Sequence, residues 1–209
     1  MDGTLIDTEK YYRVCWPKAL ADFGYYMTDE MALQCRSLGA PFAEEQFRTW
    51  FGSDFDYLKV RSHRRELVSD MVAENGIQLK TGAKEILEFL KERSIPAAVC
   101  TANDIDRANR LLKTIGLDGY FGSVISAKQA ERGKPAPDPY LLACRMIGKE
   151  PSLCAAVEDS PNGIISAYEA GCLPIMIPDQ TEPDEKLSGM LYARLNTLGE
   201  IRNLKELLA

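Results

Sequence analysis

The sequence predicts an α/β fold, in which parallel strands alternate with helices and a helical unit is inserted near the N-terminus. After Lys80, short apolar runs alternate with helical segments, a pattern typical of a parallel sheet with helices on both faces. Between Glu9 and about Asn75 there is no convincing strand. Polar clusters follow several of the core strands, at the sheet edge where such folds bind ligands. A chain of 209 residues can form a core domain and a smaller one.

The inserted unit is expected to consist of helices. Apolar residues from Tyr12 to Phe23 recur at helical spacing, and Thr28 is a suitable N-cap for a helix through Leu38. Gly39-Ala40-Pro41 interrupts the pattern. Two further helices are predicted, over 42–51 and 54–74. We therefore expect an insertion over residues 9–79 and a core formed by residues 1–8 and 80–209.

The core elements alternate along the chain. Predicted helices cover residues 83–93, 107–115, 139–147 and 161–170, and predicted strands cover 95–101, 122–127, 153–157 and 173–177. Gly171 suits the C-terminal end of the fourth helix. The first strand of a doubly wound sheet is normally internal, and no residues before Asp2 remain to form it. The first core strand is thus expected to be missing from the chain as given, leaving its neighbours with unpaired apolar edges.

Composition excludes several classes of function. The formal net charge is −6, and the densest basic point, Ser62-His63-Arg64-Arg65-Glu66, is interpreted as a solvated helix face. A nucleic acid polymer is therefore not expected as a partner. No apolar run suggests export or a membrane span. The six cysteines form no Cys-x-x-Cys pair, which favours buried reduced thiols. We expect a cytoplasmic protein without membrane contact, and a monomer.

Two of the polar clusters occur at Asp2-Gly3-Thr4 and at Thr101-Ala102-Asn103. The first, taken alone, is most simply a turn at the end of the chain. The second follows a strand and can cap the next helix through Asn103 or Asp104. A hydroxyl and backbone amides at a helix N-terminus also form a phosphate site.

The two other clusters lie in the C-terminal half. Lys134 stands between Gly133 and a proline-rich turn that fixes its backbone, which favours a functional lysine, and a surface lysine in a polar loop is the alternative. Glu158 and Asp159 directly follow a buried strand. A helix N-cap explains Asp159 or Ser160 but leaves the second acid at Glu158 unexplained. Paired carboxylates are suitable oxygen ligands for Mg²⁺.

The order and spacing of the four clusters resemble the haloacid dehalogenase superfamily of phosphotransferases. The likeness covers essentially the whole chain and is greatest to the β-phosphoglucomutase-like and pseudouridine-phosphatase-like branch. It rests on the segments MDGTLIDTE, GKPAPDPYLLAC and VEDSPNGIISAYEAG and on the late strand ending in MIPD. The resemblance implies a Rossmann-like core, identifies the insertion with that family's cap domain, and implies a small phosphorylated metabolite as substrate and Mg²⁺ as cofactor.

The resemblance also implies roles for seven residues. Asp2 matches the general acid/base and would also contact Mg²⁺ through its backbone carbonyl. Asp159 matches the direct carboxylate ligand, and Glu158 a neighbour that acts through water. Lys134 would bridge the nucleophile and the transferred phosphoryl group, while Thr101 and the amides of Ala102 and Asn103 would bind phosphate oxygens. The nucleophilic aspartate would stand one position before Met1, so the chain as given is expected to be inactive or nearly so.

The chain departs from the mutase pattern in its cap. Tyr12 replaces a hinge histidine, and residues 38–42 lack the Lys and Arg that hold a second phosphate in β-phosphoglucomutases. Hydrolysis of a monophosphate is therefore favoured over a mutase reaction, and Tyr12 and Phe42 hint at an apolar or ring-bearing leaving group. A non-catalytic protein that binds a phosphorylated ligand stays open as the alternative.

Overall fold

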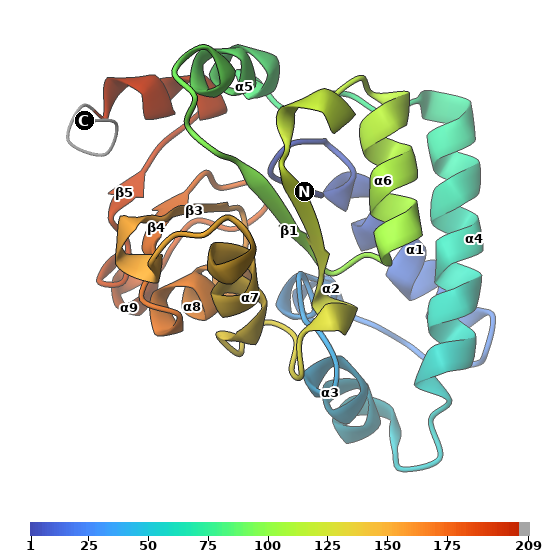
Figure 1. The fold of residues 1–209 in the computed structure, drawn as a ribbon. Helices are drawn as coiled ribbons and strands as arrows, with labels where there is room; N and C mark the ends of the chain where they lie inside the picture. The colour runs from blue at the N-terminus through green and yellow to red at the C-terminus, as the bar shows by residue number, and fades with distance from the viewer. Residues whose placement is uncertain (205–209) are drawn as a thin grey trace.

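The computed structural model describes residues 1–204, and an α/β arrangement is evident in it (Figure 1). The C-terminal end of the predicted core, residues 205–209, lies outside the described residues. No helix in the described range is long and apolar enough to cross a membrane. All six cysteines are free thiols, and four of them are buried.

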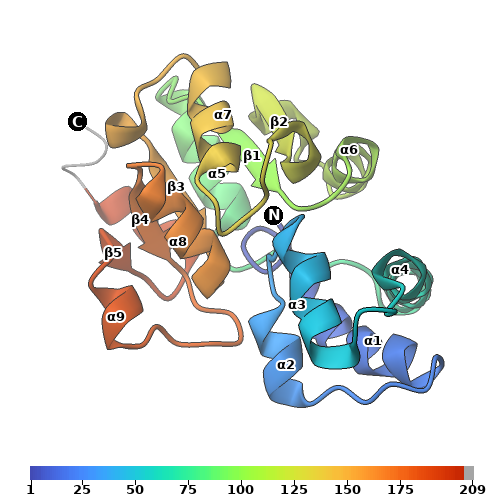
Figure 2. The ribbon, with the colours of Figure 1, turned by 90° about the horizontal axis from the view of Figure 1, so that it is seen from below.

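Residues 9–75 fold into four helices with a core of their own. The helices are α1 (Glu9–Ala21), α2 (Asp29–Gln34), α3 (Phe42–Phe51) and α4 (Tyr57–Asn75). They lie together on one side of the molecule (Figure 2), around buried Trp16, Leu20, Phe47 and Phe55. The helix predicted through Leu38 is too long, because α2 ends at Gln34 and Ser37 adopts a positive φ of 54°, which a helix cannot contain.

The remaining helices and strands form the core. The helices are α5 (Ala83–Glu92), α6 (Ile105–Thr114), α7 (Asp138–Met146), α8 (Pro161–Glu169) and α9 (Glu185–Ser188). The strands are β1 (Ala98–Thr101), β2 (Ser123–Ser126), β3 (Ala155–Glu158), β4 (Leu173–Met176) and β5 (Ala193–Arg194). Short 3₁₀ turns are η1 (Asp118–Tyr120), η2 (Ala127–Gln129), η3 (Pro151–Leu153) and η4 (Leu198–Asn203).

Several predicted boundaries shift by a few residues. The predicted strand over 95–101 begins only at Ala98, and Pro96 in its first half has no N–H to donate to a neighbouring strand. The strand over 153–157 begins at Ala155, after a 3₁₀ turn, and extends to Glu158. The last strand, β5, and α9 were not predicted, because they span only a few residues each.

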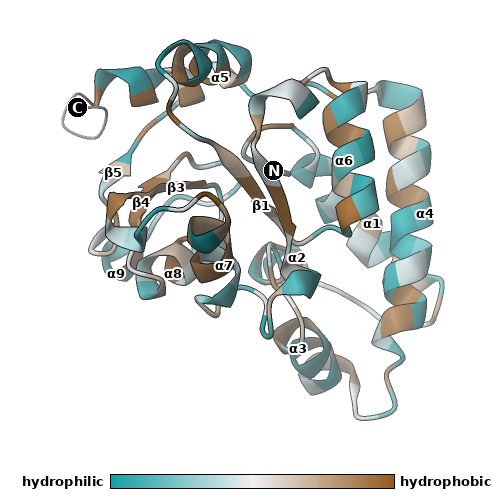
Figure 3. Ribbon diagram, viewed as in Figure 1, coloured by the Kyte–Doolittle hydropathy of each residue, from teal (hydrophilic) through white to brown (hydrophobic). Residues whose placement is uncertain are grey.

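The parallel strands form two separate sheets. β1 pairs with β2, while β3, β4 and β5 form the second sheet. β1, β3 and β4 are largely hydrophobic (Figure 3). Within residues 1–204 no strand lies between β1 and β3, and an apolar cavity of about 510 Å³ is lined by both. Residues 1–8 contribute only isolated bridges, Asp2 to Ile6 and Ile6 to Leu79. The sheet is therefore divided where the first core strand was expected to be missing.

Two chain connections join the helical unit to the core. They run side by side, because the N–H of Asp7 donates to the carbonyl of Gln78 at 2.9 Å and the N–H of Lys80 donates to that of Leu5 at 2.9 Å. A third contact is formed by the loop after α2, whose Gly39 N–H donates to the Lys134 carbonyl at 2.8 Å. The helical unit thus lies over the ends of β1 and β3.

Candidate active site

The carboxyl ends of β1 and β3 bring most of the predicted site residues to one pocket. A cavity of about 100 Å³ between the core and the helical unit is lined by Asp2, Thr101, Ala102, Asn103, Lys134 and Glu158. Asp159 is the predicted residue that does not line it. Its buried carboxylate lies behind the others, against the turn at Gly3 and Thr4.

Asp2 is held by two side chains. The hydroxyl of Thr8 donates to Asp2 Oδ1 at 2.7 Å, and the side-chain amide of Asn103 donates to Oδ2 at 2.7 Å. The Asn103 contact ties the N-terminal turn to the segment after β1, 101 residues away in the chain. The Asp2 carboxylate is thus oriented by hydrogen bonds to both oxygens.

Thr101 ends β1 and is buried. Its hydroxyl accepts a hydrogen bond from the Asn103 N–H at 3.2 Å, so the chain turns tightly before α6. Ser126 at the end of β2 supports the turn by donating to the Asn103 carbonyl at 2.6 Å. The N-cap of α6 is Asp104, as one of the two sequence alternatives proposed, although its carboxylate pairs with Arg65 and Lys128 and does not cap the helix.

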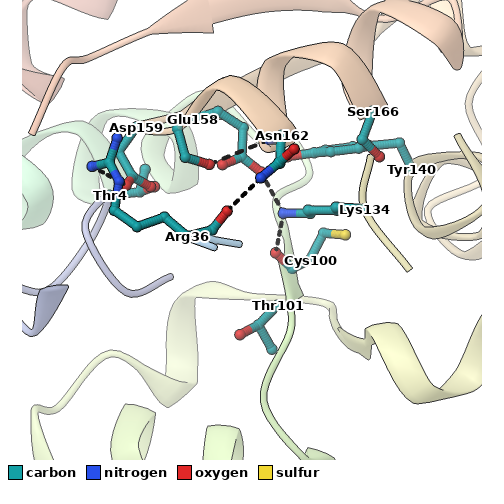
Figure 4. Close-up of polar contacts among 12 residues, drawn as sticks. Thr4, Arg36, Cys100, Thr101, Lys134, Tyr140, Glu158, Asp159, Asn162 and Ser166 are labelled. Atoms are coloured by element: carbon teal, nitrogen blue, oxygen red, sulfur yellow. Dashed lines mark hydrogen bonds and ion pairs between the residues drawn. The ribbon is translucent and has the colours of Figure 1, made fainter. Parts of the chain in front are cut away.

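Lys134 is buried rather than on the surface, with 3% of its area exposed. Its ammonium group donates to Glu158 and, at 3.3 Å, to the Cys100 carbonyl, and the hydroxyl of Tyr140 also donates to Glu158 (Figure 4). Burial raises the pKa of Glu158, but the charge of Lys134 and both hydrogen bonds hold it below the ordinary value. Glu158 is therefore an ionised carboxylate neutralised by Lys134.

Asp159 has a different environment from its neighbour. Its Oδ1 accepts from the Thr4 hydroxyl at 3.0 Å, whereas Oδ2 has no hydrogen-bond partner among the described residues. A Cβ at Gly3 would lie 2.4 Å from Oδ2, so only glycine lets the turn approach this carboxylate. Burial and the charge of Glu158 raise the pKa of Asp159 to about 6.

Glu9, at the start of α1, is a third carboxylate that the sequence analysis did not single out. It is buried and lies against the same Gly3 turn. Burial, followed by the charges of Asp159 and Asp2, raises its pKa to about 8. Glu9 is the last residue of the segment MDGTLIDTE, and its place in this motif could have identified it from the sequence.

The donor set suits a hard divalent cation. The unpartnered Asp159 oxygen and the raised pKa values of Asp159 and Glu9 mark a buried concentration of negative charge that a cation would neutralise. No three His, Cys, Asp or Glu side chains in residues 1–204 are placed to hold a metal by themselves. A cation here therefore needs backbone carbonyl, phosphate or water oxygens besides the Asp159 carboxylate.

Arginine side chains from the helical unit also reach the site, and the sequence analysis missed them. Arg36, in the loop after α2, is buried and places Nη1 3.8 Å from Asp159 Oδ2. Asn162 in α8 holds this loop by donating to the Arg36 carbonyl at 2.8 Å. Arg64 in α4 is also buried, which contradicts its interpretation as part of a solvated face.

Comparison with known proteins identifies the family. The sequence-family model of the haloacid dehalogenase-like hydrolases matches residues 1–171 of this chain. The chain belongs to this family. It is 32% identical over 201 residues to a probable pseudouridine-5'-phosphatase of Drosophila melanogaster, with 90% of this chain and 83% of the relative covered.

Two further proteins extend the comparison. A validoxylamine A 7'-phosphate phosphatase of Streptomyces hygroscopicus subsp. limoneus is 31% identical over 175 residues, covering 82% of this chain and 79% of the relative. A crystal structure of β-phosphoglucomutase from Clostridium difficile superimposes with a TM-score of 0.83 at 15% identity, covering 99% of this chain and 93% of that one. This chain is thus a hydrolase of this family with a Rossmann-like core.

Proposed function

We propose that this protein is a Mg²⁺-dependent phosphatase of a small phosphorylated metabolite. The observation that carries the proposal is the convergence of Asp2, Thr101, Asn103 and Lys134 on one pocket at the strand ends. The names of the two relatives, both phosphatases of small phosphorylated molecules, support it. We also propose that the protein acts as a monomer in the cytoplasm, a reducing compartment in which free cysteines such as these persist.

In the proposed reaction the chain's own residues bind and orient the phosphoryl group. The Thr101 hydroxyl and the amides of Ala102 and Asn103 bind phosphate oxygens, and Lys134 neutralises charge that develops on them. Asp2 would donate a proton to the leaving oxygen as a nucleophilic aspartate attacks phosphorus and forms an aspartyl-phosphate. It would then take a proton from the water that hydrolyses this intermediate, in the orientation that Thr8 and Asn103 give it.

Asp159 and the carbonyl of Asp2 would hold Mg²⁺, with Glu158 acting through water. The bound ion would supply positive charge that offsets the repulsion between phosphate and carboxylates. Residues 9–79 would act as a cap that excludes water from the pocket and selects the leaving group.

In the proposed assignment the nucleophilic aspartate would stand one position before Met1, outside the 209 residues given. We therefore expect the chain as given to bind phosphate monoesters without hydrolysing them at an appreciable rate. The test adds a strand of about six apolar residues that ends in Asp directly before Met1. This extension should confer turnover of p-nitrophenyl phosphate with Mg²⁺, whereas the matched extension ending in Asn should not.

Two results would contradict the proposal. Substantial turnover by the 209-residue chain would mean that the nucleophile is assigned wrongly. Lack of turnover by the Asp extension, together with tight binding of phosphate esters, would favour the alternative function, a non-catalytic protein that binds a phosphorylated ligand. A mutase stays disfavoured, because the loop over 38–42 contains no cation for a second phosphate.

A further inference from the structure

Helix α4 brings two arginines to the pocket from the side opposite the phosphate-binding residues. Arg61 and Arg64 both line it, together with Tyr12, Trp16 and Tyr57. Arg64 has 9% of its area exposed, and its guanidinium lies 4.7 Å from the ring of Tyr12 and 4.6 Å from that of Trp16. The two rings hold the guanidinium in place at the cap side of the cavity.

The charge of Arg64 is not balanced by an acid in the described part of the chain. Arg64 forms neither an ion pair nor a hydrogen bond within residues 1–204, and its Nε is buried without a partner. Arg61 is half-buried and also lacks an ion pair there, and burial lowers its pKa. The next residue, Arg65, differs, because it pairs with Asp104 at 2.7 Å.

A buried guanidinium without a counterion is costly to the folded protein. Removing a charge from water carries a large desolvation cost, and stacking on aromatic rings offsets only part of it. Three acids line the pocket besides the arginines. Glu158 pairs with Lys134, Asp2 accepts hydrogen bonds from Thr8 and Asn103, and Glu9 lies against the Gly3 turn and forms no ion pair with Arg64 within residues 1–204. The missing partner of Arg64 is therefore best supplied by a ligand.

We propose that Arg64, with Arg61 beside it, binds a second anionic group of the substrate, a carboxylate or a phosphate on the leaving-group side. This inference rests on the proposed phosphatase function, which assigns the other end of the pocket to the scissile phosphate. It also changes the expectation drawn from the loop over 38–42. That loop lacks cations, but α4 supplies them to the same pocket.

The test measures binding to the 209-residue chain by calorimetry with Mg²⁺ present, so that no turnover is needed. The probes are glycerol 3-phosphate, which has one anionic group, and 3-phosphoglycerate and propane-1,3-diyl bisphosphate, which have two. At least one of the two probes that carry a second anionic group should bind ten-fold or more tightly than glycerol 3-phosphate. Arg64→Met, which keeps an unbranched stem between the rings, should abolish this preference while leaving the affinity for glycerol 3-phosphate within about two-fold of wild type. The tighter binder of 3-phosphoglycerate and propane-1,3-diyl bisphosphate identifies the second group as a carboxylate or a phosphate.

Arg65→Gln is the matched control, because Arg65 is adjacent in α4 but already paired with Asp104. It should retain the preference. Thermal melting verifies that each variant is folded, and Arg61→Gln, at a half-buried position, replaces Arg64→Met if the latter unfolds. Equal affinity for all three probes, or an unchanged preference in the folded Arg64 or Arg61 variant, overturns the inference. Failure of glycerol 3-phosphate and inorganic phosphate to bind instead overturns the proposed function itself.

Discussion

Arg36 and Asp159 face each other across the boundary between the helical unit and the core, with 3.8 Å between Nη1 and Oδ2. Both side chains are buried, and neither of these two atoms has a hydrogen-bond partner among the described residues. The charge of Arg36 lowers the pKa of Asp159, but burial and Glu158 outweigh it. The two atoms are too far apart to form a hydrogen bond. The Oδ2 atom of Asp159 is therefore available to a cation.

Magnesium should stabilise the protein through Asp159. A ligand at one hundred times its Kd adds about 2.7 kcal/mol to the free energy of unfolding, and each kcal/mol raises Tm by about 2–4 °C in a chain of this size. Asp159→Asn should lose this response to Mg²⁺ and, without metal at neutral pH, melt no lower than wild type. The exposed Asp118→Asn serves as control. An unchanged Mg²⁺ response in Asp159→Asn would remove Asp159 from the metal site.

Glu9 should make the metal-free protein less stable as the pH rises. Its pKa is raised from 4.5 to about 8 in the folded state, so the folded protein retains a proton that the unfolded chain has lost. The contribution of Glu9 to stability therefore falls from about pH 4.5 to about pH 8 and changes no further above that window. Glu9→Gln should flatten this decline. Urea unfolding at pH 5, 7 and 8.5 measures it, with exposed Glu85→Gln as control, and a decline of equal slope in Glu9→Gln would contradict the prediction.

Lys134 should be required for stability as well as for binding phosphate. Lys134→Met leaves the buried carboxylate of Glu158 with only the Tyr140 hydroxyl, and breaking a buried pair costs about 3–5 kcal/mol. Lys128→Met removes an exposed pair with Asp104, which should cost less than about 1 kcal/mol. Chemical denaturation measures the free energy of unfolding of both variants and shows whether Lys134→Met loses more stability than Lys128→Met. Equal losses would mean that Glu158 does not depend on Lys134.

Gly163 should be required for the position of Glu158. A Cβ at Gly163, in the first turn of α8, would lie 2.2 Å from Glu158 Oε2. Its φ is not positive, so alanine fits the backbone and would by itself favour the helix by about 1 kcal/mol. Gly163→Ala should nevertheless lower Tm and weaken phosphate binding. Gly119→Ala, where a Cβ meets nothing within 4 Å, is the control. A Gly163→Ala protein as stable as wild type would show that Glu158 can move aside.

The cavity between β1 and β3 should bind apolar dyes. It has about 510 Å³ of space lined mostly by apolar side chains, and exposed apolar surface of this kind binds anilinonaphthalene sulfonate. The extension of about six apolar residues before Met1 should suppress the dye fluorescence and raise Tm, whether it ends in Asp or Asn. An equally long Gly/Ser extension should do neither. Equal fluorescence with the apolar and Gly/Ser extensions would mean that the strand does not enter the cavity.

Most of the fold could be predicted from the sequence, because its signals are local. Apolar runs of strand length followed by helical periodicity identified β1 to β4 and the helices after them. The helix over 42–51 was placed with correct bounds, since Pro41 precedes it and Gly52 follows it. Predicted boundaries were wrong where tertiary contacts decide them. The helix predicted through Leu38 is an example, because Ser37 adopts a positive φ that a helix cannot contain.

The candidate site was predicted in part. Residues directly after strands were identified, because the carboxyl ends of parallel strands meet at one edge. Arg36, Arg64 and Glu9 were missed or misinterpreted, because a charged residue in a helix gives no local sign of burial. Arg64 is an example, since its neighbours His63 and Arg65 are more exposed and are paired with acids.

By itself, the sequence determined the alternation of strands and helices, the helical insertion and the order of the polar clusters. These depend on residue spacing, which the chain carries in one dimension. Only the tertiary structure decided that Lys134 neutralises Glu158. It alone also showed that, within residues 1–204, Asp159 keeps an unpartnered oxygen and Arg64 faces the pocket without a counterion. Charge balance in a buried site depends on distances between segments far apart in the chain, and those distances exist only once the chain has folded.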